Sequence, residues 1–189
     1  SEDLCDGVDA DCDGRVDEDA DNTPLTCGVG VCEHTGRVSC SRAELTEAFQ
    51  QLGQDPDLRV IVLGAHGKVF CAGADLSEFD FTPGPDMVKR ADPGPIIEQA
   101  FNPTTRRLQV MRMPVIAAVN GVAAGAGASV AMACDIAIAS PQASFIQAFS
   151  KIGLIPDAGS SWLLVERLGM PRALALAMTG DKLGAQQAK

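Results

Sequence analysis

The hydrophobic pattern after the first forty residues is that of alternating helices and strands. Leu45, Phe49 and Leu52 are spaced i, i+4 and i+7, so they form one apolar helix face. A Ser-x-x-Glu capping box at residues 41–44 precedes them and Gly53 follows them. These two signals predict where the helix begins and ends.

The rest of the chain continues the alternation. Apolar runs, prolines and glycines predict strands at residues 59–63, 115–119 and 135–139, and helices at residues 128–134, 160–168 and 171–178. Strands that alternate with helices indicate an α/β fold, in which helices cover the faces of a mainly parallel sheet.

Residues 1–40 are different in kind. They show no periodic apolar face, and they hold five of the seven cysteines and eleven acidic residues against two arginines. The remaining 149 residues carry 14 acidic and 13 basic residues. A segment this short and polar can fold only with the help of disulfides or a metal. We therefore predict two domains, residues 1–40 and 41–189.

Alternating carboxylates in the front segment suggest a calcium site. Asp9, Asp11, Asp13 and Asp17 follow the pattern D-x-D-x-D-G-x-x-D, in which alternate carboxylates turn toward a hard cation and Gly permits the tight bend. The twelfth position of an EF-hand loop, a bidentate Glu, is Ala20 here, so the loop is only EF-like. An acidic, solvated tail is the alternative, and it stays open.

The front cysteines favour disulfides over zinc. Their spacing matches no common zinc motif, and five cysteines leave one unpaired in any two-bridge scheme. Residues 5–14 resemble the Cys/Asp-rich metal-binding repeats of secreted bacterial proteins. That resemblance implies bound calcium and an extracytoplasmic location for this segment. The cysteines concerned are Cys5, Cys12, Cys27, Cys32 and Cys40.

Composition excludes two classes of partner. A net charge of −10 opposes binding to nucleic-acid phosphates and to anionic lipid, and only 4% of the residues are aromatic, with no Tyr. No apolar run reaches the ~18 residues that a membrane span needs. We expect neither a nucleic acid nor a membrane as partner.

A Gly-rich turn at residues 120–127 lies between a predicted strand and a predicted helix. A dinucleotide site would need a third Gly where Val130 stands, and an acid about twenty residues further on, which is absent. The turn instead offers backbone N–H groups at a helix N-terminus, which can stabilise an anionic oxygen. Close packing of small residues is the structural alternative.

Three ordered motifs together resemble one family. Residues 66–76 read HGKVFCAGADL, residues 114–127 read PVIAAVNGVAAGAG, and residues 152–159 read IGLIPDAG. From about residue 42 to 189 the chain resembles the crotonase (enoyl-CoA hydratase/isomerase) superfamily, and within it the ring-1,2-epoxyphenylacetyl-CoA isomerases. The resemblance implies stacked ββα units, an acyl-CoA thioester substrate and no cofactor beyond the CoA of that substrate. It also implies a homotrimer or hexamer and a cytoplasmic location for this domain.

The resemblance also assigns site residues. The backbone N–H groups of Ala74 and Ala126 would hold the thioester carbonyl in an oxyanion hole. Because only the backbone takes part, Ala is acceptable at both positions. The segment that would bind the CoA part of the substrate comprises Ala72, Gly73, Asp75 and Leu76.

The acidic residues favour one reaction over another. Hydratases of the family carry two Glu residues, at the positions of Ser129 and Phe149, and both are absent here. Isomerases carry their carboxylate at the position of Asp157. One carboxylate can move a proton between two carbons, whereas adding water needs two. The alternative is that Asp157 only caps the following helix. We expect His66 to belong to a loop and not to act as a base, and Cys71 to pack as a small apolar side chain and not to act as a nucleophile.

The chain departs from the family pattern at both ends. We therefore expect the crotonase-like domain to be incomplete, with its C-terminal part missing.

Phe145 and Phe149 are candidates for an acyl pocket, although core packing is the more common use of Phe. Two functions stay open at this point. One is an acyl-CoA isomerase, and the other is a secreted calcium-binding module fused to an inactive crotonase-like fragment.

Overall fold

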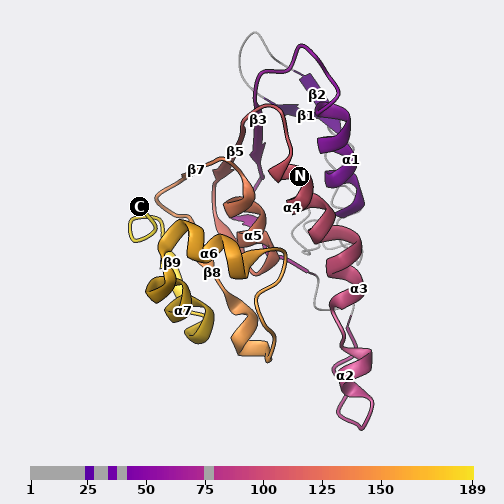
Figure 1. Cartoon of the computed structure of the whole chain (residues 1–189), viewed down its shortest axis with the longest axis vertical. Helices are drawn as coiled ribbons and strands as arrows, with labels where there is room; N and C mark the ends of the chain where they lie inside the picture. Colours follow the sequence, from indigo (N-terminus) through magenta and orange to yellow (C-terminus); the bar gives the residue numbers. More distant parts are fainter. Residues whose placement is uncertain (1–23, 28–33, 38–41, 75–78) are drawn as a thin grey trace, which may run out of the picture.

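The computed structural model describes residues 24–27, 34–37, 42–74 and 79–189, with side chains from residue 45 onward. Its strands are β1 (Pro24–Cys27), β2 (His34–Arg37), β3 (Ile61–Gly64), β4 (Val69–Cys71), β5 (Val115–Val119), β6 (Val122–Ala124), β7 (Ile136–Ala139), β8 (Ser144–Ile146) and β9 (Lys182–Gly184). Its helices are α1 (Arg42–Leu52), α2 (Met87–Arg90), α3 (Gly94–Ile96), η2 (Ile97–Phe101), α4 (Asn102–Gln109), α5 (Ala126–Ala133), η3 (Ala148–Ile152), α6 (Ser160–Leu168) and α7 (Met170–Thr179). Figure 1 shows their arrangement.

Strands β3 to β9 belong to two sheets that are built by a repeated ββα unit, and β1 and β2 form a separate pair. The first strands of three successive units form the parallel sheet β3-β5-β7, and the second strands form the parallel part of the sheet β4-β6-β8-β9. Strand β9 pairs antiparallel with β8. Helices follow the second strand of each unit, so α5 completes the second unit and α6 the third. This confirms the α/β fold that the sequence pattern predicts and the stacked ββα units that the family resemblance implies.

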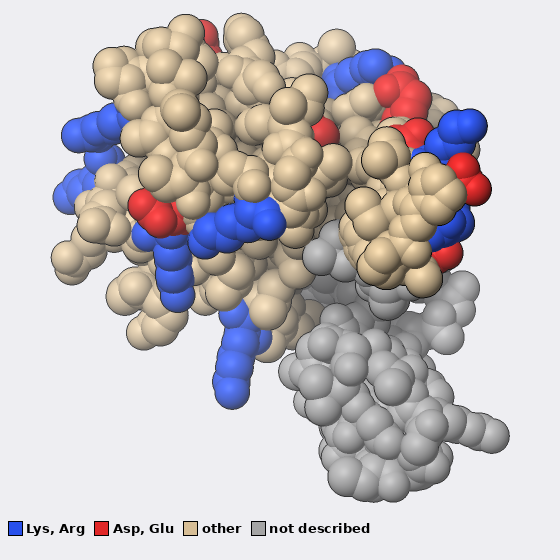
Figure 2. All heavy atoms as spheres, turned by 90° about the horizontal axis from the view of Figure 1, so that it is seen from below, with Lys and Arg blue, Asp and Glu red and all other residues tan. Residues whose placement is uncertain are grey.

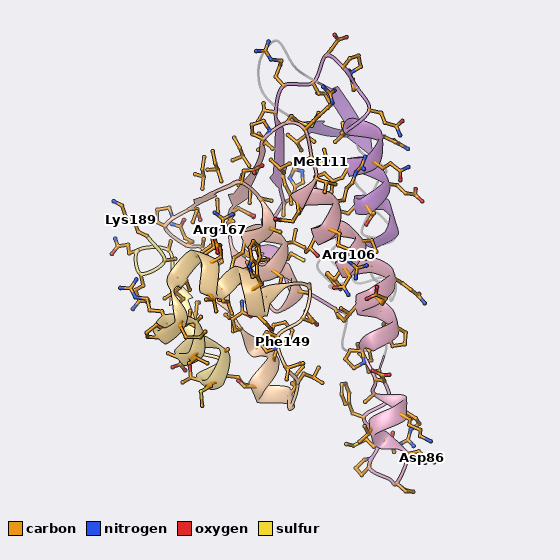
Figure 3. All side chains as sticks on the ribbon, viewed as in Figure 1. Asp86, Arg106, Met111, Phe149, Arg167 and Lys189 are labelled. Carbon is orange, nitrogen blue, oxygen red and sulfur yellow. The ribbon has the colours of Figure 1, made fainter. Side chains whose placement is uncertain are left out.

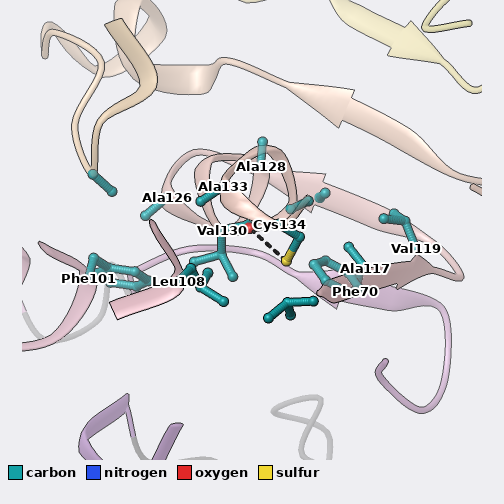
Figure 4. Packing of buried hydrophobic residues seen from close by; sticks show 14 of the residues in the cluster. Phe70, Phe101, Leu108, Ala117, Val119, Ala126, Ala128, Val130, Ala133 and Cys134 are labelled. Carbon is teal, nitrogen blue, oxygen red and sulfur yellow. Dashed lines mark hydrogen bonds between the residues drawn. The ribbon is translucent and has the colours of Figure 1, made fainter. Parts of the chain in front are cut away.

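Helix α5 lies at the centre of the core. Seven of its eight residues are buried, and they are Ala, Gly, Ser or Val. Their small size lets β4, β6, α4 and α6 approach the helix closely. Figure 4 shows Val130 and Cys134 among the surrounding apolar side chains, with the Cys134 thiol donating to the Val130 carbonyl oxygen at 3.4 Å. Burial raises the pKa of this thiol to about 12, which keeps it protonated and unreactive.

The predicted element bounds hold with small shifts. Strand β3 begins at Ile61 instead of Arg59, because pairing starts where the Ile61 N–H donates to the Pro114 carbonyl oxygen at 3.0 Å. Helix α5 begins two residues before the predicted Ala128, directly after Gly125. Glycine has a low helix propensity, but close packing against β4 overrides that preference at Gly127.

Strand β7 forms an open edge of its sheet among the described residues. It pairs with β5 on one side only. Ile136 and Ile138 are 51% and 61% exposed. The strand is anchored at its start, where the Asp135 carboxylate accepts a hydrogen bond from the Val115 N–H at 2.8 Å.

The front segment is expected to be irregular, but its described residues form the antiparallel pair β1–β2. The calcium candidates Asp9, Asp11, Asp13 and Asp17 lie outside the described residues. Within the part that is described, no group of three or more metal-binding side chains comes together. None of the described helices combines the length and the apolar character that crossing a membrane requires.

The charged side chains are unevenly distributed over the face that Figure 2 shows. Acidic and basic side chains lie next to one another along one edge, and mainly Lys and Arg lie on the opposite half. All eleven acidic residues of the front segment fall outside the described residues. The near balance of charge in residues 41–189 agrees with this picture.

Candidate active site

A cavity of about 100 Å³ opens at the carboxyl ends of neighbouring parallel strands. Ala72, Gly73 and Ala74 follow β4, while Gly125 and Ala126 follow β6, and all five line the cavity. Because β4 and β6 are paired and parallel, their carboxyl ends lie side by side. The pairing thus brings together two of the three sequence motifs.

Two backbone N–H groups are available at this cavity. Ala126 is the first residue of α5, so its N–H has no acceptor inside the helix. The N–H of Ala74 has no hydrogen-bond acceptor among the described residues. A Cβ atom placed on Gly73 would lie 3.3 Å from the Ala126 nitrogen, which shows how closely the two segments approach. The predicted oxyanion-hole residues therefore share one small space.

Glycines make that approach feasible. Gly73 and Gly125 have φ values of +91° and +52°, a region that favours glycine. Gly127 lies against the end of β4, where an added Cβ would overlap the Cys71 carbonyl oxygen and come within 2.6 Å of its carbonyl carbon. The absence of a side chain at Gly127 is thus a condition for this packing.

Asp157 lines the same cavity from the third unit. It stands in the loop between η3 and α6, where the Ser160 N–H donates to the Asp157 carbonyl oxygen at 2.8 Å. The two residues between them, Ala158 and Gly159, have φ values of +47° and +82°, as in a type I′ turn. A positive φ is uncommon for Ala and marks a backbone that its surroundings hold in place.

The Asp157 carboxyl is in an unusual electrostatic environment. Burial raises its pKa from the ordinary 3.8 to about 6, and a hydrogen bond from its own backbone N–H offsets only part of that effect. Its Oδ1 atom is buried and has no hydrogen-bond partner among the described residues. No other described residue that lines the cavity is titratable. The cavity therefore holds one carboxyl group that changes charge near neutral pH.

The capping interpretation of Asp157 does not fit this geometry. Helix α6 has Gly159 at its N-cap position, and no side chain of a described residue caps its first turn. The Asp157 side chain faces the cavity, and only its carbonyl oxygen takes part in the turn.

The raised pKa predicts that Asp157 destabilises the fold at neutral pH. Between pH 3.8 and about 6 the folded chain binds more protons than the unfolded chain, so stability falls as pH rises through this window. The Asp157→Asn variant removes this cost. We expect it to be about 1–3 kcal/mol more stable than the parent at pH 7, and equally stable near pH 3.5. Urea unfolding at both pH values measures the difference.

The exposed Asp181 provides the control for this measurement. Asp181→Asn makes the same chemical change outside the cavity, and we expect it to leave stability nearly unchanged at both pH values. A gain for Asp157→Asn that is equally large near pH 3.5 and at pH 7 would contradict the electrostatic cause.

Apolar side chains form the rest of the cavity wall. Phe149, at the position of the second hydratase acid, is 5% exposed and lines the cavity, and its ring approaches Gly125. Figure 3 shows Phe149 on the segment that precedes α6. Phe145, the other acyl-pocket candidate, lines a separate cavity between α5, α6 and α7.

Phe79 and Phe81 are among the cavity-lining residues that the sequence pattern did not indicate. Their rings lie 6.1 Å apart and are tilted by 49°. Asp80, which lies between the two Phe residues in the sequence, forms an ion pair with Arg90 of α2, and its Oδ2 atom is 2.7 Å from the Arg90 Nε atom. This ion pair links the segment to α2. A Phe-Asp-Phe run followed by a Pro/Gly-rich loop is the signal that could have pointed to them.

The other candidates lie elsewhere or are not described. His66 is exposed in the turn between β3 and β4, and Cys71 ends β4 beside Gly127. Asp75 and Leu76, assigned to substrate binding, lie outside the described residues. Ser129, at the position of the first hydratase acid, is fully buried and does not line the cavity.

Comparisons with known proteins place the chain in one family. Residues 39–189 match the family model described as enoyl-CoA hydratase/isomerase. The chain is 47% identical over 147 residues to 1,2-epoxyphenylacetyl-CoA isomerase of Escherichia coli K12, covering 77% of this chain and 55% of that protein. It is 37% identical over 145 residues to the trans-2-decenoyl-[acyl-carrier-protein] isomerase of Streptococcus mutans, covering 77% of this chain and 54% of that protein.

A solved structure supports the fold as well. The crystal structure of an enoyl-CoA hydratase from Mycobacterium avium subsp. paratuberculosis superposes with a TM-score of 0.66 at 34% identity, covering 78% of this chain and 52% of that one. The chain spans about half the length of the curated relatives it matches. The chain matches the family model, it is built of ββα units, and residues of all three motifs line one cavity. The chain therefore belongs to the enoyl-CoA hydratase/isomerase family.

Proposed function

We propose that the cavity binds an acyl-CoA thioester and moves a double bond by proton transfer, which is an isomerase reaction. The observation that carries this proposal is the Asp157 carboxyl, the one titratable group among the described residues of a largely apolar cavity that the backbone of Ala74 and Ala126 also lines. Hydration would call for a second acid or base to activate water. The two matched isomerases, from Escherichia coli and Streptococcus mutans, support the same choice.

The proposed steps use only groups of this chain. The thioester carbonyl accepts hydrogen bonds from the Ala74 and Ala126 N–H groups, which stabilise negative charge on its oxygen. The Asp157 carboxylate takes a proton from the carbon chain, and the C–H electron pair is delocalised into the enolate. The acidic proton of Asp157 exchanges with solvent between the two transfers, and protonated Asp157 then gives a proton to a different carbon. The double bond moves and no atom is gained or lost.

The electrostatics of Asp157 suit both halves of this cycle. A carboxyl group with a pKa of about 6 is mostly ionised at pH 7, so it can accept a proton. It is also a stronger base than an ordinary Asp, since burial disfavours its charged form. The Phe149, Phe79 and Phe81 side chains give the cavity a largely apolar wall, and a less polar environment strengthens the two hydrogen bonds to the oxyanion.

The choice between isomerase and hydratase can be tested by product analysis in D₂O. The chain, at high concentration, is incubated with a trans-3-enoyl-CoA and, separately, with crotonyl-CoA. We expect deuterium to enter the acyl carbons of the first substrate as its double bond moves. We expect no 3-hydroxyacyl-CoA from the second. The rate should fall as pH decreases through about 6, because Asp157 becomes protonated.

Formation of 3-hydroxyacyl-CoA at a rate similar to that of deuterium incorporation would contradict the isomerase proposal. A fall in rate centred near pH 4 would instead indicate that an ordinary, exposed carboxyl group is the base.

A further inference from the structure

Two buried hydroxyl groups meet directly behind the Asp157 turn. Ser129 of α5 and Ser160, the first residue of α6, are both fully buried, and their Oγ atoms are within hydrogen-bond contact. The Ser129 hydroxyl also lies 3.4 Å from the Asp157 carbonyl oxygen and 3.3 Å from that of Gly125. The pair thus joins the helix that begins at Ala126 to the turn that carries Asp157.

Counting protons fixes the direction of these hydrogen bonds. Each serine hydroxyl has one proton to donate. If Ser129 donated to Ser160, the Ser160 proton would have no acceptor among the described residues. If Ser160 donates to Ser129, the Ser129 proton can be shared by the carbonyl oxygens of Asp157 and Gly125, and both protons are used. Buried hydroxyls favour the arrangement in which both are satisfied.

The Asp157 carboxyl makes few interactions of its own that could fix its position. Its Oδ1 atom has no partner among the described residues, and the next residue, Ala158, has a positive φ. Such a backbone persists only where its surroundings over-determine it. On the α5 side, the hydrogen bond that the turn receives comes from Ser129.

We propose that the Ser129–Ser160 pair is a positioning device that fixes the proton-transferring carboxyl relative to the oxyanion hole. This inference rests on the proposed function and adds two residues to it. Neither serine touches the cavity, so they act through the backbone of Asp157 and Gly125. A displacement of about 1 Å at a reacting group can reduce a rate about a hundredfold, which is why such a link matters.

The test compares Ser129→Ala and Ser160→Ala with the control Ser144→Ala. Ser144 is also a buried serine, 1% exposed, but its hydroxyl has no partner among the described residues. All variants are made in the full 189-residue chain. The first readout is the pH titration of the Asp157 carboxyl carbon by NMR, assigned with Asp157→Asn. The second is kcat and KM for deuterium incorporation into a trans-3-enoyl-CoA.

We expect the titration midpoint of Asp157 to fall by about one pH unit or more in Ser129→Ala, as the released turn moves the carboxyl toward water. We expect kcat to fall about 10- to 100-fold while KM changes less than about twofold. Ser160→Ala should show a smaller shift in the same direction, and Ser144→Ala none. If Ser129→Ala does not fold, Ser160→Ala alone decides between these outcomes.

Equal titration midpoints and equal kcat values in the parent chain, the folded pair variants and Ser144→Ala would overturn the positioning role. The titration does not depend on turnover. If the parent chain shows no deuterium incorporation, the proposed function fails, and the titration still decides whether the serine pair holds the carboxyl.

Discussion

Replacing Asp157 by Asn is expected to lower deuterium incorporation into a trans-3-enoyl-CoA about a thousandfold. The amide keeps the size of the side chain but cannot accept a proton, and removing a general base typically costs a factor of this order. The Ala74 and Ala126 N–H groups are unchanged, so the affinity for the thioester should stay within about threefold. Exchange is measured by mass spectrometry and affinity by calorimetry with an unreactive acyl-CoA.

Asp181→Asn is the matched control for this experiment, because it makes the same change at an exposed position outside the cavity. It should leave both exchange and affinity at the parent value. Undiminished exchange by Asp157→Asn would assign the base to another residue. Together with the stability gain expected at pH 7, the same variant would show that the carboxyl is retained at a cost to the fold.

Gly127→Ala is expected to damage both the fold and the site. The new Cβ would overlap the backbone of Cys71, which cannot move like the end of a flexible side chain. Strand β4 and helix α5 would have to separate, and with them the segments that carry Ala74 and Ala126. We expect a loss of about 3 kcal/mol or more in the free energy of unfolding and at least about tenfold weaker acyl-CoA binding. Urea unfolding and calorimetry measure these effects.

Gly64→Ala serves as the control for that variant. Its added Cβ would have its nearest contact at 4.0 Å, with Ala118, and its φ is not positive. We expect its stability to be within about 1 kcal/mol of the parent. A Gly127→Ala variant as stable as Gly64→Ala would mean that β4 and α5 can separate without harm, and that the close approach is not required.

The parts of this structure that follow from local pattern could be predicted from the sequence. Periodicity and capping signals locate α1, β5, α6 and α7, because each depends on residues within one short window. The resemblance to a family predicts that Ala74, Ala126 and Asp157 belong to one site. The structure places all three at one cavity. Their proposed roles remain to be tested by the experiments above.

The parts that depend on contacts distant in sequence could not be predicted. Ser129 and Ser160 are 31 positions apart, and nothing near either serine in the sequence indicates that the two meet. The helix formed by α3, η2 and α4 likewise contains a π-helical turn at Ile97–Phe101 that no local signal announced. The positive φ of Ala158 is a further case, since this conformation favours Gly and is held here by the surrounding structure.

The repeated ββα unit has a consequence for how such a site can change in evolution. Each unit supplies cavity residues from the segment that follows its second strand: Ala74 and its neighbours from the first, Ala126 from the second, and Asp157, beyond η3, from the third. Where the proposed contribution is a backbone N–H group, as at Ala74 and Ala126, side-chain replacement can be tolerated as long as the glycines stay. Among the described residues that line the cavity, only Asp157 of the third unit has a titratable side chain. Exchange of that unit's short loop is therefore one modular route by which such a scaffold could acquire different chemistry while the segments of the proposed oxyanion hole stay constant.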